Sequence, residues 1–129
     1  MTDSITPSQN VHHVEVAIAG AGFGGLCMAI KLQEAGITDF VILEKGDDVG
    51  GTWRDNQYPG AACDVQSHMY SYSFATSPKW TKRYAPWNEI QQYILDVTEQ
   101  YRLRQKIRLQ QEGESAVFNE GTGRWTVKT

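Results

Sequence analysis

Three glycines at a fixed spacing are the residues whose chemistry can be inferred first. They form the pattern Gly20-x-Gly22-x-x-Gly25, which follows the mostly apolar run Val14 to Ala19. In such a pattern the first glycine permits a tight turn from strand to helix, the second lets backbone approach a pyrophosphate, and the third lets the helix pack against the strand. The helix N-terminus adds unpaired N–H groups and a partial positive charge. The pattern therefore predicts a pyrophosphate-binding turn.

The flanking sequence supplies the strand–helix–strand frame that this motif needs. Apolar residues at helical spacing follow Gly25 and stop at Gly36, and residues 39–44 have the pattern of a second buried strand, which ends in Glu44. An acid at this point accepts hydrogen bonds from ribose hydroxyls and repels a 2′-phosphate, so it favours the ADP moiety of FAD or NAD over NADP. The alternative is a βαβ unit whose glycines serve packing only.

Length and composition limit the class of protein. The chain has 129 residues, 40% of them hydrophobic, and a net charge of -3. This length allows at most one domain. It has neither a basic patch nor a charge block, so we expect no nucleic-acid or membrane partner. The longest apolar run is far shorter than the roughly 18 residues of a membrane span. Residues 1–10 are polar and lack the basic and apolar regions of a signal peptide, so none is expected. Residues 1–12 are expected to be a flexible tail.

The cysteines and histidines are not spaced as a redox pair or as a set of metal ligands. Cys27 and Cys63 are not spaced as a C-x-x-C pair, and we expect free thiols in a cytoplasmic protein. A metal site through His12, His13 and His68 is conceivable. No acidic or cysteine partner stands at ligand spacing from them, so we expect no metal site.

Residues 46–86 form a long stretch without a helix or strand pattern. Unstructured connections of more than about 12–15 residues inside a compact domain are usually functional or disordered. Chains that stay unfolded are poor in aromatic residues, whereas this stretch is rich in them, so we expect an ordered segment that faces a ligand. Its aromatic residues, with the one directly after it, are Trp53, Tyr58, Tyr70, Tyr72, Phe74, Trp80, Tyr84 and Trp87.

The remaining sequence predicts one more helix and three strands. The helix would be capped by Asn88, and its core stripe would be Ile90, Ile94, Val97 and Tyr101. Residues 106–109 are expected to form a third strand beside the second, and residues 115–118 and 125–128 a hairpin. The expected fold is α/β: a Rossmann-like βαβ unit with a parallel sheet, a long aromatic-rich loop and a β-hairpin, together an incomplete doubly wound domain over residues 13–129.

The stretch from Gly50 to Phe74 carries the resemblance to a known family. It contains Gly-Gly-Thr-Trp at 50–53, Asn-Gln-Tyr-Pro-Gly at 56–60, Cys-Asp at 63–64 and Tyr-Ser-Tyr-Ser-Phe at 70–74. This resembles the N-terminal part of Baeyer–Villiger monooxygenases, the class B flavoprotein monooxygenases that include the cyclohexanone and acetophenone types. The resemblance implies the FAD-binding portion of an enzyme that uses NADPH and O2 to oxidise a ketone to an ester or lactone.

The same resemblance implies cofactor roles for the residues that match the family motif. The glycine turn would hold the FAD pyrophosphate, the acid after the second strand the adenosine ribose, and the Thr-Trp pair the flavin side, with a tyrosine farther along it. These residues are Gly20, Gly22, Phe23, Gly25, Glu44, Thr52, Trp53 and Tyr70. For Trp53 the alternative is ordinary aromatic packing.

Asp64 is the candidate catalytic residue. In similar enzymes an aspartate here lies beside the flavin and pairs with an arginine from the NADP-binding part, and the pair supports oxygen chemistry while NADP stays bound. Ala62 and Cys63 would then touch the nicotinamide end together with Asp64. The alternative is a turn carboxylate that caps local N–H groups after Pro59-Gly60.

Other signatures of the family do not occur in these 129 residues. A second glycine-rich turn for NADPH and the F-x-G-x-x-x-H-x-x-x-W-P motif are missing, and Gln66 stands where proline is frequent. We therefore expect the NADPH domain and the C-terminal return segment to be absent, and the isolated chain to be inactive. Two alternatives remain open: a fragment of an N- or S-oxygenating flavin monooxygenase, and a non-catalytic module from a truncated gene that binds FAD or ADP.

Overall fold

A three-stranded parallel sheet forms the centre of the structure, a computed structural model that describes residues 10–129. Residues 1–9, most of the expected tail, lie outside the described residues. The strands are β1 (Val16–Ala19), β2 (Phe40–Leu43) and β3 (Ile107–Arg108), in the order β1-β2-β3. The carboxyl ends of all three strands therefore meet at one edge of the sheet.

The middle strand fixes the register of the sheet. In β2, Ile42 pairs with Ile18 of β1 and with Ile107 of β3. The ladder continues past the strand, because the Glu44 N–H donates to the Arg108 carbonyl at 3.0 Å. The predicted third strand beside the second is confirmed, although only Ile107–Arg108 of the expected residues 106–109 belong to it.

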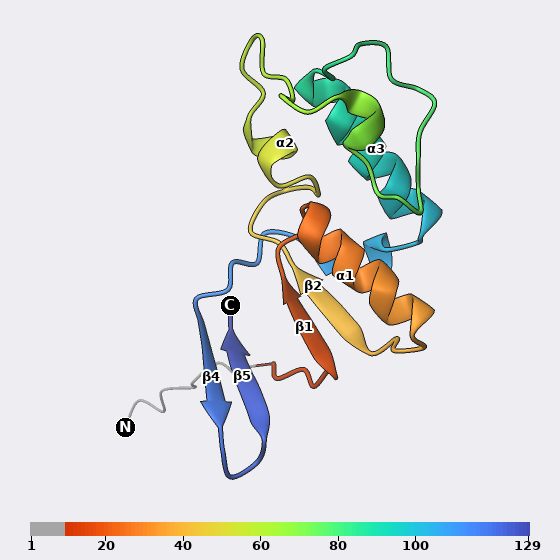
Figure 1. Ribbon diagram of the computed structural model, residues 1–129. Coiled ribbons are helices and arrows are strands. Elements are labelled where there is room, and N and C mark those ends of the chain that lie inside the picture. Colours follow the sequence, from red (N-terminus) through yellow and green to blue (C-terminus); the bar gives the residue numbers. More distant parts are fainter. Residues whose placement is uncertain (1–9) are drawn as a thin grey trace.

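The helix α1 (Phe23–Glu34) runs across one face of the sheet (Figure 1). It begins at Gly22, which is its N-cap, so two of the three motif glycines lie close to or inside its first turn. The three buried residues of α1 lie three or four positions apart around Leu26, on one side of the helix, as expected for a helix that covers a sheet. The residues that pack together here are Leu26, Ala29 and Ile30 of the helix and Ile18, Phe40 and Ile42 of the strands.

The aromatic-rich segment is ordered, and its contribution to the core confirms that part of the prediction. It contains two short helices that the sequence pattern did not indicate, α2 (Thr52–Asp55) and η1 (Ser67–Met69). Several of its aromatic side chains are partly buried against the core. They are Trp53, Tyr70, Tyr72, Phe74 and Trp80.

The helix α3 (Trp87–Gln100) confirms the predicted helix but not its cap. Pro86 is the N-cap, and Asn88 lies inside the first turn, so the prediction that Asn88 caps the helix is wrong. The chain enters α3 through a bridge between Ala62 and Pro86, and the Trp87 N–H donates to the Ala61 carbonyl at 2.9 Å. Backbone of the preceding segment therefore satisfies one of the first N–H groups of α3, which have no partner inside the helix.

The apolar stripe of α3 is core, as predicted. Ile90 and Ile94 are fully buried, Val97 is 2% exposed, and Tyr101 is partly buried at the C-cap. A 3-10 turn, η2 (Arg104–Lys106), then leads into β3. The helix α3 lies beside α2 and contacts it (Figure 1).

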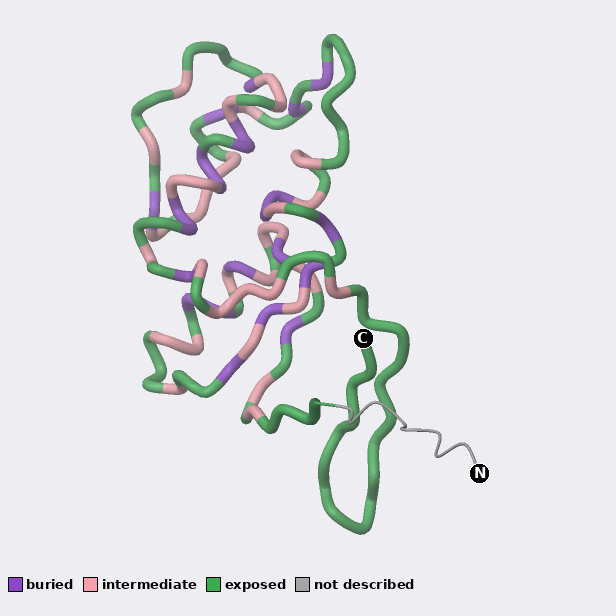
Figure 2. The backbone as a smooth tube through the Cα atoms, turned by 180° about the vertical axis from the view of Figure 1, so that it is seen from behind, coloured by how far each residue is buried: buried purple, intermediate pink, exposed green. Residues whose placement is uncertain are grey.

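The predicted hairpin is confirmed as β4 (Ser115–Asn119) and β5 (Arg124–Lys128). Phe118 pairs with Trp125, and Gly123 supplies a turn residue with φ +65°. The hairpin projects away from the parallel sheet (Figure 1), and all of its residues are exposed (Figure 2).

Three observations concern cysteines, membrane-spanning helices and metal ligands outside the nucleotide motif. Cys27 and Cys63 are free thiols, as expected. Within residues 10–129, no helix is both long and apolar enough to cross a bilayer. The same residues include no group of three or more His, Cys, Asp or Glu arranged to hold a metal ion.

Candidate nucleotide-binding site

The first glycine turn joins β1 to α1 at the carboxyl edge of the sheet. Gly20 has φ +94°, a conformation that side chains disfavour, and its N–H donates to the Leu43 carbonyl at 2.7 Å. At Gly25 a Cβ atom would lie 1.9 Å from the Gly20 carbonyl oxygen, so helix and strand are as close as glycine allows. The two steric roles predicted for these glycines are therefore present.

The N-terminus of α1 has the features of an anion-binding end. No side chain of the described residues caps it, and its first turn contains no acidic residue. The free N–H groups and the helix dipole both favour a negatively charged ligand there. At Gly22 a Cβ would meet nothing nearer than the Gly51 Cα at 3.6 Å, so the backbone is open to a ligand.

A second glycine turn, residues 46–51, lies directly against the first. The Gly50 N–H donates to the Ala21 carbonyl at 2.9 Å, and a Cβ on Gly51 would lie 3.2 Å from the Gly22 Cα. Gly50 and Gly51 have φ +127° and +55°. No site role was expected for these two glycines, although consecutive glycines before Thr52 indicate left-handed backbone.

Glu44 joins the two turns. Its carboxylate accepts hydrogen bonds from the Ala21 N–H at 2.7 Å and from the Gly46 N–H at 2.9 Å, and the residue is 4% exposed. Charge-assisted bonds of this kind are stronger than neutral ones. A carboxylate offers about four lone-pair sites, so two acceptor positions remain beside these bonds. The acid predicted to meet a ribose thus stands at the sheet edge, between both glycine turns.

Three of the predicted cofactor residues form one aromatic group next to α1. The Trp53 Nε1–H donates to the Tyr70 hydroxyl at 3.0 Å, and the two rings are T-shaped with centroids 5.8 Å apart. Phe23, the first residue of α1, makes a second T-shaped contact with Tyr70 at 5.3 Å. Thr52 is exposed at the start of α2, directly after the second turn.

The partly buried Tyr72 and the buried Tyr93 hold this aromatic group in place, and no pattern in the sequence indicates their pairing. The Tyr72 hydroxyl donates to the Phe23 carbonyl, while the Tyr93 hydroxyl of α3 donates to the Ala75 carbonyl at 2.6 Å and accepts from the Tyr72 N–H at 2.9 Å. Burial raises the pKa of both phenols above the usual 10.0, so both stay neutral donors at physiological pH.

Asp64 lies in a bend that follows the bridge between Ala62 and Pro86, beside the start of α3. The Cys63 N–H donates to the Ala85 carbonyl at 2.9 Å, which fixes the segment to the chain before α3. The side chain of Cys63 is buried, whereas Ala62 and Asp64 on either side are exposed. Among residues 10–129 no hydrogen bond or ion pair engages the Asp64 carboxylate, so it does not cap the local turn.

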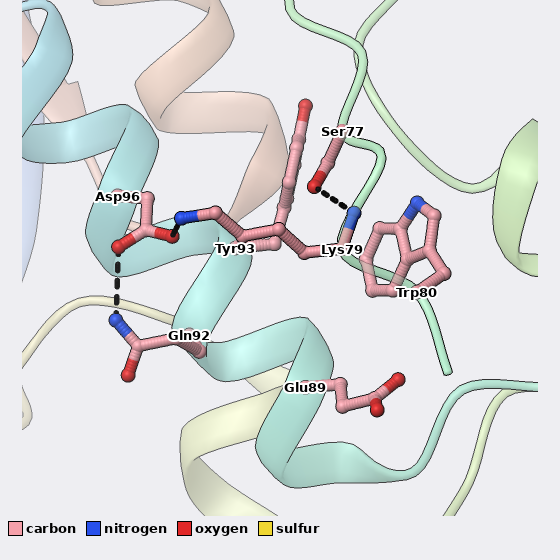
Figure 3. Close-up of a pocket in the computed structure, with 7 residues that line it drawn as sticks. All are labelled: Ser77, Lys79, Trp80, Glu89, Gln92, Tyr93 and Asp96. Carbon is pink, nitrogen blue, oxygen red and sulfur yellow. Dashed lines mark hydrogen bonds and ion pairs between the residues drawn. The ribbon is translucent and has the colours of Figure 1, made fainter. Parts of the chain in front are cut away.

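Two small pockets lie away from both glycine turns. Figure 3 shows the first, of about 80 Å³, between α3 and the segment that carries Ser77 and Trp80; Lys79 and Gln92 both contact Asp96 there, at 3.5 and 2.9 Å. The second, of about 150 Å³, adjoins it. Ligand pockets usually have roughly 300–1,000 Å³, so neither accommodates a dinucleotide.

Comparison with known proteins agrees with this geometry. A family model described as an NAD(P)-binding Rossmann-like domain matches residues 18–86. The Baeyer-Villiger monooxygenase of Streptomyces coelicolor is 46% identical over 122 residues, a match that covers 94% of this chain and 24% of that protein. The chain thus spans about a quarter of the length of this curated relative.

Solved structures of monooxygenases have the same fold. An oxidized steroid monooxygenase bound to NADP superposes with a TM-score of 0.83 and 40% identity, over 89% of this chain and 23% of that one. The OTEMO complex with FAD and NADP gives 0.83 and 28%, over 92% and 23%. The sequence resemblance to Baeyer–Villiger monooxygenases and the Rossmann-like fold are both confirmed, and the chain belongs to the family of NAD(P)-binding Rossmann-like domains.

Proposed function

We propose that the chain is the FAD-binding part of a flavin monooxygenase that uses NADPH and O2 to oxidise ketones to esters or lactones. The observation that carries this proposal is the pair of abutting glycine turns at the N-terminus of α1, joined by the buried Glu44. The similarity to relatives named Baeyer-Villiger monooxygenase selects this reaction over N- or S-oxygenation. Residues 13–129 would be the N-terminal portion of the FAD domain, and the NADPH site would lie in other parts of the longer enzyme.

The residues present fit the phosphate and ribose portion of FAD. Gly20 has a backbone conformation that disfavours a side chain, and Gly25 has no room for one. Gly22 is open on the side away from Gly51. In the proposal Gly20, Gly22 and Gly25 hold the pyrophosphate, through backbone N–H groups and the dipole of α1, while Glu44 accepts hydrogen bonds from the ribose. When bound, FAD supplies the redox and oxygen chemistry.

The aromatic group would border the flavin half of the cofactor. In the proposal Thr52, Trp53 and Tyr70 line that half, with Phe23 beneath Tyr70. This assignment is supported by the hydrogen bond between Trp53 and Tyr70, by their partial burial and by their position next to the second glycine turn. An apolar wall of this kind excludes water and fixes the orientation of a ring system.

Asp64 is proposed as the catalytic residue of this chain. It would orient an arginine supplied by the NADPH-binding part, because a free carboxylate can fix a guanidinium by bidentate hydrogen bonds. Its support is the exposed carboxylate without a local partner. Ala62 is exposed beside it and would touch the nicotinamide end, where Cys63 would contribute backbone, since its side chain is buried.

Partners and location complete the proposal. The reaction requires a small ketone and O2, and no nucleic acid or membrane takes part in it. We place the protein in the cytoplasm, and the support is its two free thiols, which are typical of a reducing compartment.

A titration of the purified chain with FAD tests the proposal. We expect one FAD per chain, competition by ADP, and weaker binding of NADP, because the carboxylate of Glu44 repels a 2′-phosphate. Quenched flavin fluorescence would report the nearby Trp53 and Tyr70. Failure to bind FAD, or tighter binding of NADP than of FAD, would contradict the proposal.

A further inference from the structure

The second glycine turn is held from behind by a glutamine of α3. The Gln91 Nε2–H donates to the Val49 carbonyl at 2.7 Å, a bond between residues 42 positions apart. Gln91 is 8% exposed, and Val49 and Gly50 are buried as well. A buried hydrogen bond fixes its partners, since leaving either group unpaired is costly. One helix side chain therefore fixes the backbone immediately before Gly50.

Gln91 adds a second constraint on position 50, beside the φ of +127° that already favours glycine there. A Cβ on Gly50 would lie 1.9 Å from the Gln91 Oε1 and 2.7 Å from its Cδ, so the amide occupies the space of a side chain. Within residues 10–129 this buried Oε1 has no hydrogen-bond partner. A polar oxygen is thus kept against the Gly50 backbone without a hydrogen bond of its own, and a side chain at position 50 would have to displace the Gln91 amide.

A second contact from beyond α3 restrains the same turn. The Arg104 guanidinium donates to the Asp48 carboxylate at 2.6 Å, and the same carboxylate oxygen accepts from the Val49 N–H at 2.8 Å. This ion pair is half-exposed and therefore weaker than the buried bond of Gln91. Asp48 and Val49 are thereby both fixed by residues that follow the aromatic-rich segment.

We propose that Gln91 is a positioning residue that preforms the second glycine turn for the dinucleotide. By fixing Val49 and filling the space next to Gly50, it holds the Gly50 N–H on the Ala21 carbonyl and Gly51 against Gly22. The two turns then present their backbone together before the ligand arrives, which reduces the cost of ordering them on binding. This inference rests on the proposed FAD site, but the ordering of the turn is measurable without ligand.

The test compares Gln91→Met, which keeps the volume but removes the N–H donor, with Gln92→Met on the exposed face of the same helix. Amide hydrogen exchange of Gly50 in the ligand-free chain is the first measurement. Gln91→Met should accelerate exchange of the Gly50 N–H about tenfold, because the turn opens locally, and Gln92→Met should leave it unchanged. Gln91→Asn, whose amide is one methylene shorter, is the second variant and should resemble Gln91→Met.

Val97→Ala separates positioning from general stability, because it removes a core contact of α3 away from the turn. It should lower the melting temperature yet leave the FAD Kd unchanged well below that temperature. Gln91→Met should raise the Kd about tenfold, as expected if the turn holds the binding conformation a tenth of the time. Unchanged Gly50 exchange in Gln91→Met and Gln91→Asn overturns the inference, as does an unchanged Kd. If the unmodified chain binds no FAD, the proposed function fails, while Gly50 exchange still decides the role of Gln91.

Discussion

Replacing either of two adjacent glycines in α1 with alanine should have opposite effects. At Gly25 a new Cβ would lie 1.9 Å from the Gly20 carbonyl oxygen and 2.9 Å from its carbon. Ordinary contacts begin at 3.4 Å, so α1 must move from β1 by about 1.5 Å (3.4 − 1.9). Because the obstacle is backbone, no rotamer change relieves it.

The magnitudes follow from packing and helix propensity. Overpacking usually costs about 1–3 kcal/mol, and a backbone clash of this size belongs at the upper end, about 3 kcal/mol. For a domain of this size that lowers the melting temperature by roughly 10 °C. At Gly24 a Cβ would meet nothing within 4 Å and φ is ordinary, so alanine should stabilise the helix by about 0.5 kcal/mol.

Thermal unfolding and FAD titration of both variants check this reasoning. We expect Gly24→Ala to melt slightly higher and to keep FAD binding, and Gly25→Ala to melt much lower and to lose it. Equal melting temperatures for the two variants would refute the argument that Gly25 is required by the contact of α1 with Gly20.

Three further substitutions test the site. Glu44→Gln can accept only one of the two N–H donors, so it should cost about 2 kcal/mol of unfolding free energy by urea titration; unchanged stability would contradict the bridge between the turns. Trp53→Phe loses the bond to Tyr70 and should cost about 1 kcal/mol, whereas Trp125→Phe in the exposed hairpin should cost nothing measurable; equal urea midpoints would count against the aromatic group. Burial raises the pKa of Tyr72 in the folded state above its unfolded value of 10.0. The contribution of the neutral Tyr72 phenol to the free energy of unfolding is therefore complete below pH 10 and is lost as the pH rises above 10. Tyr72→Phe should therefore weaken the alkaline fall in stability and Tyr58→Phe, which is exposed, should not; identical pH profiles for both would be the contrary result.

The elements that could be predicted are those determined by residues that lie close together in the sequence. Gly20 and Gly25 were predictable because a strand-to-helix turn imposes their steric limits within a few residues. The hairpin was predictable from alternating strands with glycines between them. The start of α3 was predicted wrongly, because Trp87 already belongs to the helix and is fixed by its bond to the Ala61 carbonyl, a contact that depends on the fold of the preceding segment.

The parts that could not be predicted depend on contacts between distant positions. A side chain at position 50 would meet the Gln91 amide, and nothing near position 50 indicates this contact with a residue of α3. Likewise the aromatic residues indicated an ordered segment, but the bonds from Tyr72 to Phe23 and from Tyr93 to Ala75 link three separate elements. Periodicity does not encode such pairs.

Amide chemical-shift mapping of the chain during addition of FAD tests the proposed nucleotide site most directly. The largest changes are expected at Gly20, Gly22, Gly50 and Gly51, where the two glycine turns meet. Changes confined to the pocket between α3 and residues 77–80 (Figure 3), or no changes at all, would contradict it.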